Sequence, residues 1–180
     1  DILRSFGIPI YEKQGFEADD IIGTIARMVR KKHPDIEVVI ATGDLDTLQL
    51  IDDHTKVYTM KKGVSDTALY NEAYVRERFG LAPKQMTDYK GLRGDPSDNI
   101  PGVRGIGEKT ASELLQAYGS VEEMYRKLKK NELSAKPGVI AALKTYEADA
   151  LFSKTLATID SHVPVEFVLA QARMKKAASR

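Results

Sequence analysis

The sequence predicts an α/β layer followed by an α-helical layer. The first observation is a short apolar run, Glu37–Thr42, that lies between two stretches with helical spacing of apolar residues. A second strand-like run, Lys56–Met60, follows it, and no strand pattern occurs after Asn71. Because strands flanked by helices usually run parallel, the first layer should be a partial parallel sheet with helices against it. Helical patterns separated by glycine and proline predict the second layer.

The elements of the first layer follow in order. Asp1–Gly7 is typical of a helix end closed by glycine, and Ile8–Tyr11 is predicted as a short strand. A helix opens at Glu17 and ends before Pro34. After the strand at residues 37–42 we expect a short helix, Leu45–Ile51, and then the second strand.

The second layer is expected to begin after a turn at Lys62-Gly63. Asn71 is a natural N-cap for a helix that Gly80 ends. The predicted helices are Glu72–Phe79, Pro83–Leu92, Glu108–Tyr118, Val121–Leu128 and a last one from Val139 through Tyr146. We therefore divide the chain into an α/β core, a helical part and a tail or linker, at residues 1–70, 71–168 and 169–180.

Composition excludes several classes of protein. The chain of 180 residues contains no cysteine, which excludes disulfides, thiolate metal sites and cysteine nucleophiles. Its three histidines, His33, His54 and His162, are far apart in the sequence, which disfavours a zinc site. No apolar run approaches the length of a membrane span, and no secretory leader opens the chain. We expect a cytoplasmic protein with no membrane partner.

The charges are distributed unevenly along the chain. Residues 1–100 carry 14 Lys+Arg and 17 Asp+Glu, whereas residues 101–180 carry 13 and 9. Two interpretations of this difference are open. One is ordinary surface variation. The other is an acidic catalytic half joined to a basic half that holds phosphates.

Seven carboxylates gather in three short clusters. They are Glu17, Asp19 and Asp20, then Asp44 and Asp46, then Asp95 and Asp98. Each cluster has a structural alternative, since acids stabilise a helix start by roughly 0.3–1 kcal/mol and Asp also caps turns. Gathered in one pocket, however, they would repel one another unless a cation compensates them. Mg²⁺ or Mn²⁺ suits such oxygen ligands, and two ions about 3.5–4 Å apart can hydrolyse a phosphodiester.

A glycine-rich hairpin follows the last cluster. Its candidate phosphate-binding residues are Gly102, Arg104, Gly105, Gly107, Lys109 and Thr110. It is not a Walker loop, because Glu108 separates Lys109 from the last glycine, and it is not a dinucleotide fingerprint, which must leave a strand. Backbone amides at the next helix start, with two cations, suit phosphate oxygens. The alternative is a tight turn between packed helices; phosphate contacts would give sequence-independent, salt-dependent binding.

Three stretches together resemble one family. Gly15–Asp20, Thr42–Leu50 and Leu92–Ala111 resemble the 5′-nuclease (5′–3′ exonuclease, flap-endonuclease-like) domain of bacterial DNA polymerase I, with similarity from the start to about Pro164. The resemblance implies a metal-dependent nuclease that cuts 5′ flaps and 5′ ends of branched DNA in primer removal and repair. It also implies a nucleoid-associated location in the cytoplasm.

The resemblance also assigns the clusters. It places Glu17, Asp19 and Asp20 at a first metal site. It places Asp44, Asp46 and Asp98 at a second, with Asp95 nearby. The hairpin resembles the family's helix–three-turn–helix element, which grips duplex DNA and often holds a K⁺ ion.

One departure from the family leaves alternatives open. The family's N-terminal strand with its Asp, a second early Asp and the helical arch are absent from this sequence. We therefore expect the missing N-terminal segment of the same domain as a partner, and a polymerase domain downstream. A second hypothesis is a sequence-independent DNA-binding module without catalysis, and a third is another metal-dependent hydrolase, such as an RNA-cutting relative.

Overall fold

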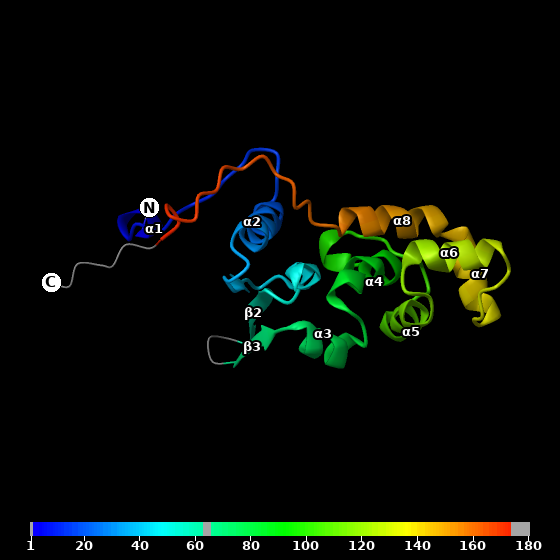
Figure 1. Cartoon of the computed structure of the whole chain (residues 1–180). Coiled ribbons are helices and arrows are strands. Elements are labelled where there is room, and N and C mark those ends of the chain that lie inside the picture. Colours follow the sequence, from blue (N-terminus) through cyan, green and yellow to red (C-terminus); the bar gives the residue numbers. More distant parts are fainter. Residues whose placement is uncertain (1, 63–65, 174–180) are drawn as a thin grey trace.

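The computed structural model describes residues 2–62 and 66–173, which form a small sheet layer and a larger helical layer (Figure 1). The helices are α1 (Ile2–Ser5), α2 (Ala18–Lys32), α3 (Glu72–Phe79), α4 (Met86–Arg93), α5 (Glu108–Tyr118), α6 (Val121–Lys129), α7 (Pro137–Thr145) and α8 (Glu147–Leu156). The strands are β1 (Val38–Ala41), β2 (Thr55–Lys62) and β3 (Asp66–Tyr70), and the 3-10 turns are Leu45–Leu50, Pro83–Gln85 and Pro96–Asp98. No helix of the described residues has the length and apolar character needed to cross a membrane.

The sheet has the order β1-β2-β3. β1 and β2 are parallel, with Ile40 opposite Val57, and β2 and β3 are antiparallel, with Tyr58 opposite Leu69. The predicted fold class, an α/β layer with a parallel strand pair followed by a helical layer, is confirmed. β3 was not predicted, since the strand is only five residues long and its sequence pattern is weak.

The strand predicted at Ile8–Tyr11 is wrong. The segment is extended but joins no sheet, because no strand of the described sheet lies beside it. Instead it runs alongside the returning C-terminal segment, and the ring centroids of Tyr11 and Phe167 are 5.6 Å apart (Figure 1). The pair fixes the two segments by side-chain packing in place of a backbone ladder.

Several predicted boundaries are confirmed by local capping. The side chain of Asn71 accepts a hydrogen bond from the backbone N–H of Tyr74 at 2.9 Å, and Gly80 ends α3 in the left-handed region. The helix predicted at 45–51 is a 3-10 turn instead of an α-helix. Gly63 of the predicted turn and residues 174–180 of the predicted tail lie outside the described residues.

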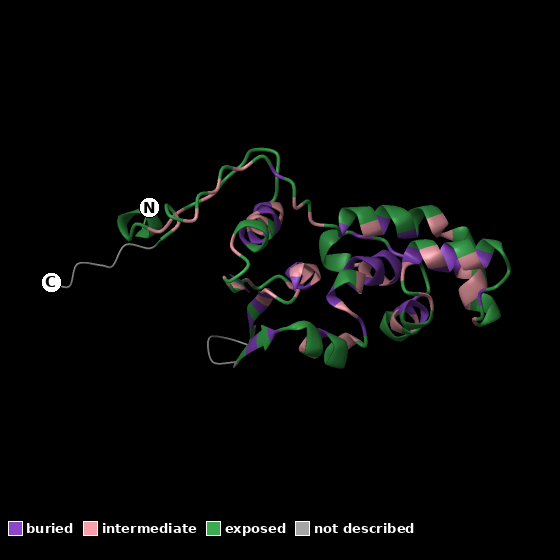
Figure 2. Ribbon diagram, in the orientation of Figure 1, coloured by how far each residue is buried: buried purple, intermediate pink, exposed green. Residues whose placement is uncertain are grey.

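One hydrophobic core joins the two layers. It runs from Val57 and Tyr70 in the sheet through Leu92 in α4 to Leu115 in α5, and Figure 2 shows the buried residues on the inner faces of these elements. α4 lies at the centre of the helical layer. A Cβ atom at Gly91 would lie 3.1 Å from a backbone oxygen of α8, so the glycine allows α4 and α8 to approach closely.

A buried carboxylate ties three helices together. Asp88 of α4 is only 4% exposed, and it accepts hydrogen bonds from the N–H of Val121 at 2.8 Å and the ammonium of Lys154 at 2.7 Å. Lys154 also pairs with Glu122 at 2.7 Å. The partners satisfy the buried charge, which therefore fixes α4 against the start of α6 and against α8.

The segment after α8 returns to the α/β layer. The Thr24 hydroxyl accepts a hydrogen bond from the N–H of Val163 at 3.0 Å, and Arg27 donates to the carbonyl oxygen of Ser161 at 2.7 Å. The side chain of Gln49 accepts from the N–H of Ile159 at 3.0 Å. Residues 159–163 thus lie against α2 and the 3-10 turn, whereas our division places them in the helical part; the division stays a prediction.

Candidate metal centre and phosphate-binding hairpin

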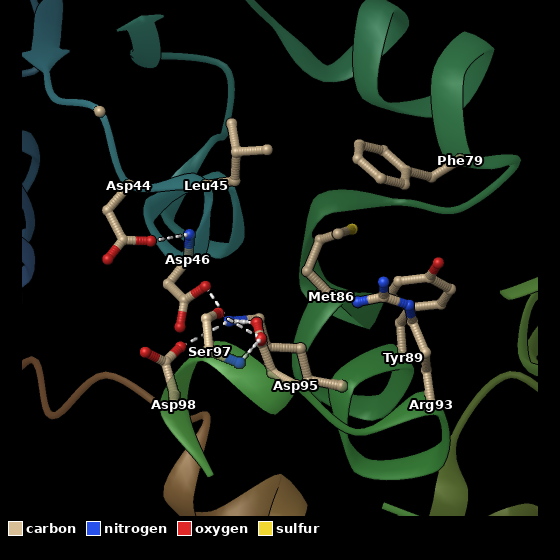
Figure 3. A pocket seen from close by; sticks show the side chains of 12 residues that line it. Asp44, Leu45, Asp46, Phe79, Met86, Tyr89, Arg93, Asp95, Ser97 and Asp98 are labelled. Atoms are coloured by element: carbon tan, nitrogen blue, oxygen red, sulfur yellow. Dashed lines mark hydrogen bonds and ion pairs between the residues drawn. The ribbon is translucent and has the colours of Figure 1, made fainter. Parts of the chain in front are cut away.

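The carboxyl end of β1 supplies the first side of the candidate site. The side chain of Asp44 accepts a hydrogen bond from the N–H of Asp46 at 2.9 Å and so caps the following 3-10 turn. The hydroxyl of Thr42 accepts from the N–H of Asp44 at 3.0 Å. This turn directs the Asp46 side chain toward the C-terminal end of α4 (Figure 3).

The loop after α4 supplies the second side. Asp95 and Ile100 exchange two backbone hydrogen bonds, of 2.8 and 2.9 Å, which close the loop at its base. The Asp95 carboxylate accepts hydrogen bonds from the backbone N–H and the hydroxyl of Ser97. The closed loop holds Asp95 and Asp98 on the same side as Asp46.

Asp46, Asp95 and Asp98, called here the acidic trio, converge although they come from two distant segments. One carboxylate oxygen from each lies within 4.8 Å of the others (Figure 3). In the part of the chain that the structure describes, no other group of three acids or histidines brings ligand atoms so close. Three hard oxygen donors at this spacing can coordinate a divalent cation such as Mg²⁺ or Mn²⁺.

The ammonium of Lys90 lies among the trio. It contacts the carboxylate of Asp46, lies 2.8 Å from that of Asp95 and 3.5 Å from that of Asp98. Sequence analysis missed Lys90, because the contact joins residues 44 positions apart and no local pattern marks it. One ammonium leaves the trio with a net negative charge, so the site remains attractive to cations.

The pKa values of the cluster reflect this arrangement. Burial alone would raise the pKa of Asp95, but hydrogen bonds from Lys90 and Ser97 lower it to about 2. Burial raises the pKa of Asp46, with Lys90 opposing it. Burial would lower the pKa of Lys90, but its hydrogen bonds to Asp46 and Asp95 raise it instead. Opposite charges therefore hold the group together at neutral pH.

The acids at the start of α2, Glu17, Asp19 and Asp20, are not part of the acidic trio, but Asp19 interacts electrostatically with Asp44 and Asp46. Burial, and then the charges of Asp44 and Asp46, raise the pKa of Asp19, so the first two clusters are electrostatically coupled. The carboxylate of Asp20 accepts hydrogen bonds from the N–H groups of Glu17 at 3.1 Å and Asp160 at 2.8 Å. Asp20 thereby has a structural role at the helix start, and metal binding by these three acids stays a prediction.

A cavity of about 580 Å³ opens beside the trio. The acids line one side of it, and Phe79, Met86 and Tyr89 line another (Figure 3). Sequence analysis did not predict this aromatic side, since its members look like ordinary helix residues. Its volume falls in the range of about 300–1,000 Å³ of small-molecule ligand sites.

The glycine hairpin is fixed to the C-terminal end of α4 and to α8. Gly102 has a φ of +62°, and a Cβ there would lie 2.2 Å from the backbone nitrogen of Gly94. The N–H of Gly102 donates to the hydroxyl of buried Ser153 at 2.9 Å, so it is directed inward and away from any ligand. The N–H of Val103 donates to Leu92 at 2.8 Å. These hydrogen bonds hold the start of the hairpin against α4 and α8, next to the acidic loop.

The outer side of the hairpin is open to solvent. Arg104, Gly105, Gly107 and Lys109 are exposed, and Thr110 is half-buried. The side chain of Lys109 is 89% exposed. α5 begins at Glu108, and the first backbone N–H groups of a helix lack intrahelical acceptors. These N–H groups can donate hydrogen bonds to a phosphate oxygen. The DNA-binding role of the hairpin stays a prediction.

Comparison with known families decides the relationship. Residues 1–80 match the model of the 5′-3′ exonuclease N-terminal resolvase-like domain, and residues 81–180 match that of the 5′-3′ exonuclease C-terminal SAM fold. The chain belongs to the 5′–3′ exonuclease family. The resemblance found in the sequence is thereby confirmed, and the family is one of nucleases. The two models meet at residue 80, ten residues after the division that we predicted.

Curated relatives and solved structures agree with this membership. DNA polymerase I of Bacillus caldotenax is 44% identical over 169 residues, and that of Bacillus subtilis is 43% identical over 166 residues. The matches cover 94% and 92% of this chain but 19% and 18% of those proteins, so the chain spans about a fifth of their length.

Two solved structures share the fold. The T5 5′-exonuclease with bound zinc matches with a TM-score of 0.75 and 22% identity, covering 89% of this chain and 56% of that chain. The catalytic core of Rad2 in complex with DNA substrate matches with a TM-score of 0.58 and 19% identity, covering 93% and 57%.

Proposed function

We propose that this chain supplies most of the acidic site and the DNA grip of a divalent-metal-dependent 5′ nuclease. The substrate is DNA with a 5′ flap or a 5′ end, and the reaction is hydrolysis of a phosphodiester. The observation that carries the proposal is the convergence of the acidic trio next to an exposed, basic glycine hairpin. Family membership supports the reaction class, since the family is one of nucleases.

The donor atoms fit a hard divalent cation. Asp46, Asp95 and Asp98 would hold Mg²⁺ or Mn²⁺ with carboxylate oxygens. Asp44 would contribute to this site, which is the second metal site that the resemblance implies. Glu17, Asp19 and Asp20 would serve the first site, and the electrostatic coupling of Asp19 to Asp44 and Asp46 supports two neighbouring ions. When bound there, two such ions would supply an activated water and stabilisation of the leaving oxygen. The 3-10 turn after β1 and the loop after α4 hold the acids close together, and the ammonium of Lys90 limits the repulsion between their carboxylates.

The hairpin would bind the DNA backbone. Its exposed Arg104 and Lys109, with the N–H groups at the start of α5, contact phosphates and carry no base information. Gly105 and Gly107 let the backbone come close, and Thr110 adds a hydroxyl. The hairpin would also hold a K⁺ ion. Binding should therefore be independent of sequence and should weaken steeply with salt.

The relatives suggest the biological setting. They are bacterial DNA polymerases I, so we propose primer removal and DNA repair in the nucleoid-associated cytoplasm, with a polymerase domain downstream. The T5 5′-exonuclease structure contains bound divalent metal ions and the Rad2 catalytic core is in complex with DNA substrate, which supports both ligands. The missing N-terminal segment of the family would complete the first metal site.

Cleavage of a labelled 5′-flap duplex tests the proposal. In the domain completed by the family's N-terminal segment, we expect cutting at the junction with Mg²⁺ or Mn²⁺, none with EDTA, and loss of cutting in Asp98→Ala. The matched control is Asp35→Ala, which removes an exposed acid from the loop after α2. If Asp98→Ala cuts as well as the control, the proposed mechanism is wrong.

An alternative function is sequence-independent DNA binding without catalysis. Lys90 favours it, because its ammonium already neutralises part of the acidic trio. Flap binding at low salt without metal-dependent cutting would support this alternative. Under either function, Lys109→Ala should weaken binding evenly across sequences and lower the salt slope by about 1.

A further inference from the structure

The aromatic side of the site cavity has no part in the hydrolytic chemistry described above. Phe79 at the end of α3 and Met86 and Tyr89 in α4 line it, with Leu45 at its edge. In Figure 3 Phe79 and Tyr89 lie across the cavity from the acids, with Met86 between them and Arg93 beside Tyr89. A metal ion and a phosphate need only the acidic side, so the remaining volume is shaped for a different group.

The aromatic side presents rings at an angle to each other. The centroids of Phe79 and Tyr89 are 6.0 Å apart with an interplanar angle of 63°. Tyr89 is buried and Phe79 is half-buried, so Phe79 keeps ring surface accessible while Tyr89 supports it from behind. A supported, partly open ring is a suitable platform for a flat ligand.

Two arginines lie against these rings, and one of them, Arg93, lines the cavity. The guanidinium carbon of Arg78 lies 5.0 Å from the ring centroid of Phe79, and that of Arg93 lies 6.0 Å from the ring centroid of Tyr89. A guanidinium plane stacks well on electron-rich aromatic systems and attracts phosphate. An aliphatic side chain of another protein would gain nothing from these charges, whereas a nucleotide gains from both the rings and the arginines.

Arg93 also connects the aromatic side to the hairpin. It forms an ion pair of 3.0 Å with Glu108, the first residue of α5. Because Arg93 also lines the cavity, it lies between the acids and the start of α5. A DNA strand whose phosphates contact the hairpin and the acidic trio therefore has to pass this residue.

We propose that the aromatic side of the cavity binds an unpaired nucleobase of the nucleotide next to the scissile phosphate, by stacking on Phe79 with Arg93 alongside. The inference rests on the proposed function and adds a subsite to it. Stacking is tolerant of base identity, since every base has a π-face, so the subsite selects an unpaired nucleotide without reading sequence. Phe79 would thus be a positioning group for single-stranded DNA at the junction.

An abasic scan of the substrate tests this subsite. A fluorescent 5′-flap duplex carries one abasic residue at each of the nucleotides on either side of the junction in turn, and its affinity for the full chain is measured by anisotropy. Ca²⁺ replaces Mg²⁺, and a gel verifies that the strand remains intact. At one position the abasic residue should weaken binding roughly 5- to 150-fold, the range of a lost base–aromatic stack. Exchanging the four bases at that position should change little.

Protein variants locate the effect. In Phe79→Ala the intact and abasic flaps should bind alike, and Phe79→Tyr, which keeps the ring, should restore their difference. Phe152→Ala is the matched control, because it removes an aromatic ring that is 58% exposed on α8, away from the cavity. The scan itself uses the unaltered chain, so it remains decisive if Phe79→Ala does not fold.

Each outcome decides the matter. Equal affinity at every abasic position, with tight binding of the intact flap, overturns the subsite and leaves the proposed function standing. A difference that persists in Phe79→Ala also overturns it, since the base then stacks elsewhere. Failure of the chain to bind the intact flap duplex at low salt removes the proposed function and the subsite together.

Discussion

Replacing Lys90 with methionine would show how strongly one ammonium holds the acidic trio together. The change keeps a flexible side chain of similar length and removes the charge. Two carboxylates, those of Asp46 and Asp95, would each lose a hydrogen bond to a cation, and both side chains are less than one-fifth exposed. Breaking a mostly buried charge pair costs about 3–5 kcal/mol, which corresponds to a loss of roughly 6–20 °C in the melting temperature of a chain of this size.

The assay is unfolding followed by circular dichroism, first in EDTA and then across a Mg²⁺ series. We expect Lys90→Met to melt well below the unaltered chain in EDTA and to recover more stability with Mg²⁺, because a dication can replace the missing ammonium. At a Mg²⁺ concentration 100 times the dissociation constant, binding adds about 2.7 kcal/mol. The control is Lys84→Met, an exposed lysine in the turn before α4. Equal melting of the two variants in EDTA would refute the reasoning.

Three further outcomes follow from the structure. Lys154→Met should destabilise the chain by about 3–5 kcal/mol in urea unfolding, because it leaves buried Asp88 without its cation; a cost below that of a typical surface change would contradict this. Burial would raise the pKa of Glu122, but Lys154 lowers it. The stability that Glu122 contributes is therefore present above its unfolded pKa and is lost as the pH falls through the folded value. Unfolding midpoints of Glu122→Gln and the unaltered chain should differ at pH 7 and converge in acid; a constant difference would contradict the ion pair. Gly102→Ala should cost more stability than the roughly 1–2 kcal/mol of left-handed strain, because its Cβ would lie 2.2 Å from a backbone nitrogen. Gly105→Ala has nothing within 4 Å of its Cβ and should cost about that strain alone. Equal losses of stability in thermal unfolding would contradict the close approach at Gly102.

The elements that sequence analysis predicted well carry their signals locally. α3 lies between an asparagine N-cap and a left-handed glycine, and α5 lies between Gly107 and Gly119, so a few adjacent residues set both ends. Strands lack such independence, because a strand exists only where another edge is available to pair with it. The predicted strand at Ile8–Tyr11 has no such edge, while Asp66–Tyr70 has one in β2 and forms a strand from a weaker pattern.

The same distinction separates the predicted and the missed parts of the site. The acids were found because each cluster is a short motif after a strand, at a helix start or before a hairpin. Lys90 and Phe79 were missed because their importance comes from neighbours that are distant in the sequence. Asp20 combines both situations. Its motif was recognised in the sequence, but one of its oxygens accepts a hydrogen bond from the N–H of Asp160, 140 positions away, and no motif indicates that contact.

The return of the chain after α8 has a consequence for the order of folding. α2 and the turn that carries Asp46 are fastened by residues 159–163, through contacts such as that of Thr24 with Val163, 139 positions apart. Contacts of such long sequence separation form late, because loop closure has to precede them. On a ribosome, a nascent chain that ends at α6 would contain the acidic loop and the hairpin but not residues 159–163. The hairpin would also wait for α8, because the N–H of Gly102 donates to the hydroxyl of Ser153. The first and second clusters of acids would gain their final spacing later still, once residues 159–163 have been synthesised.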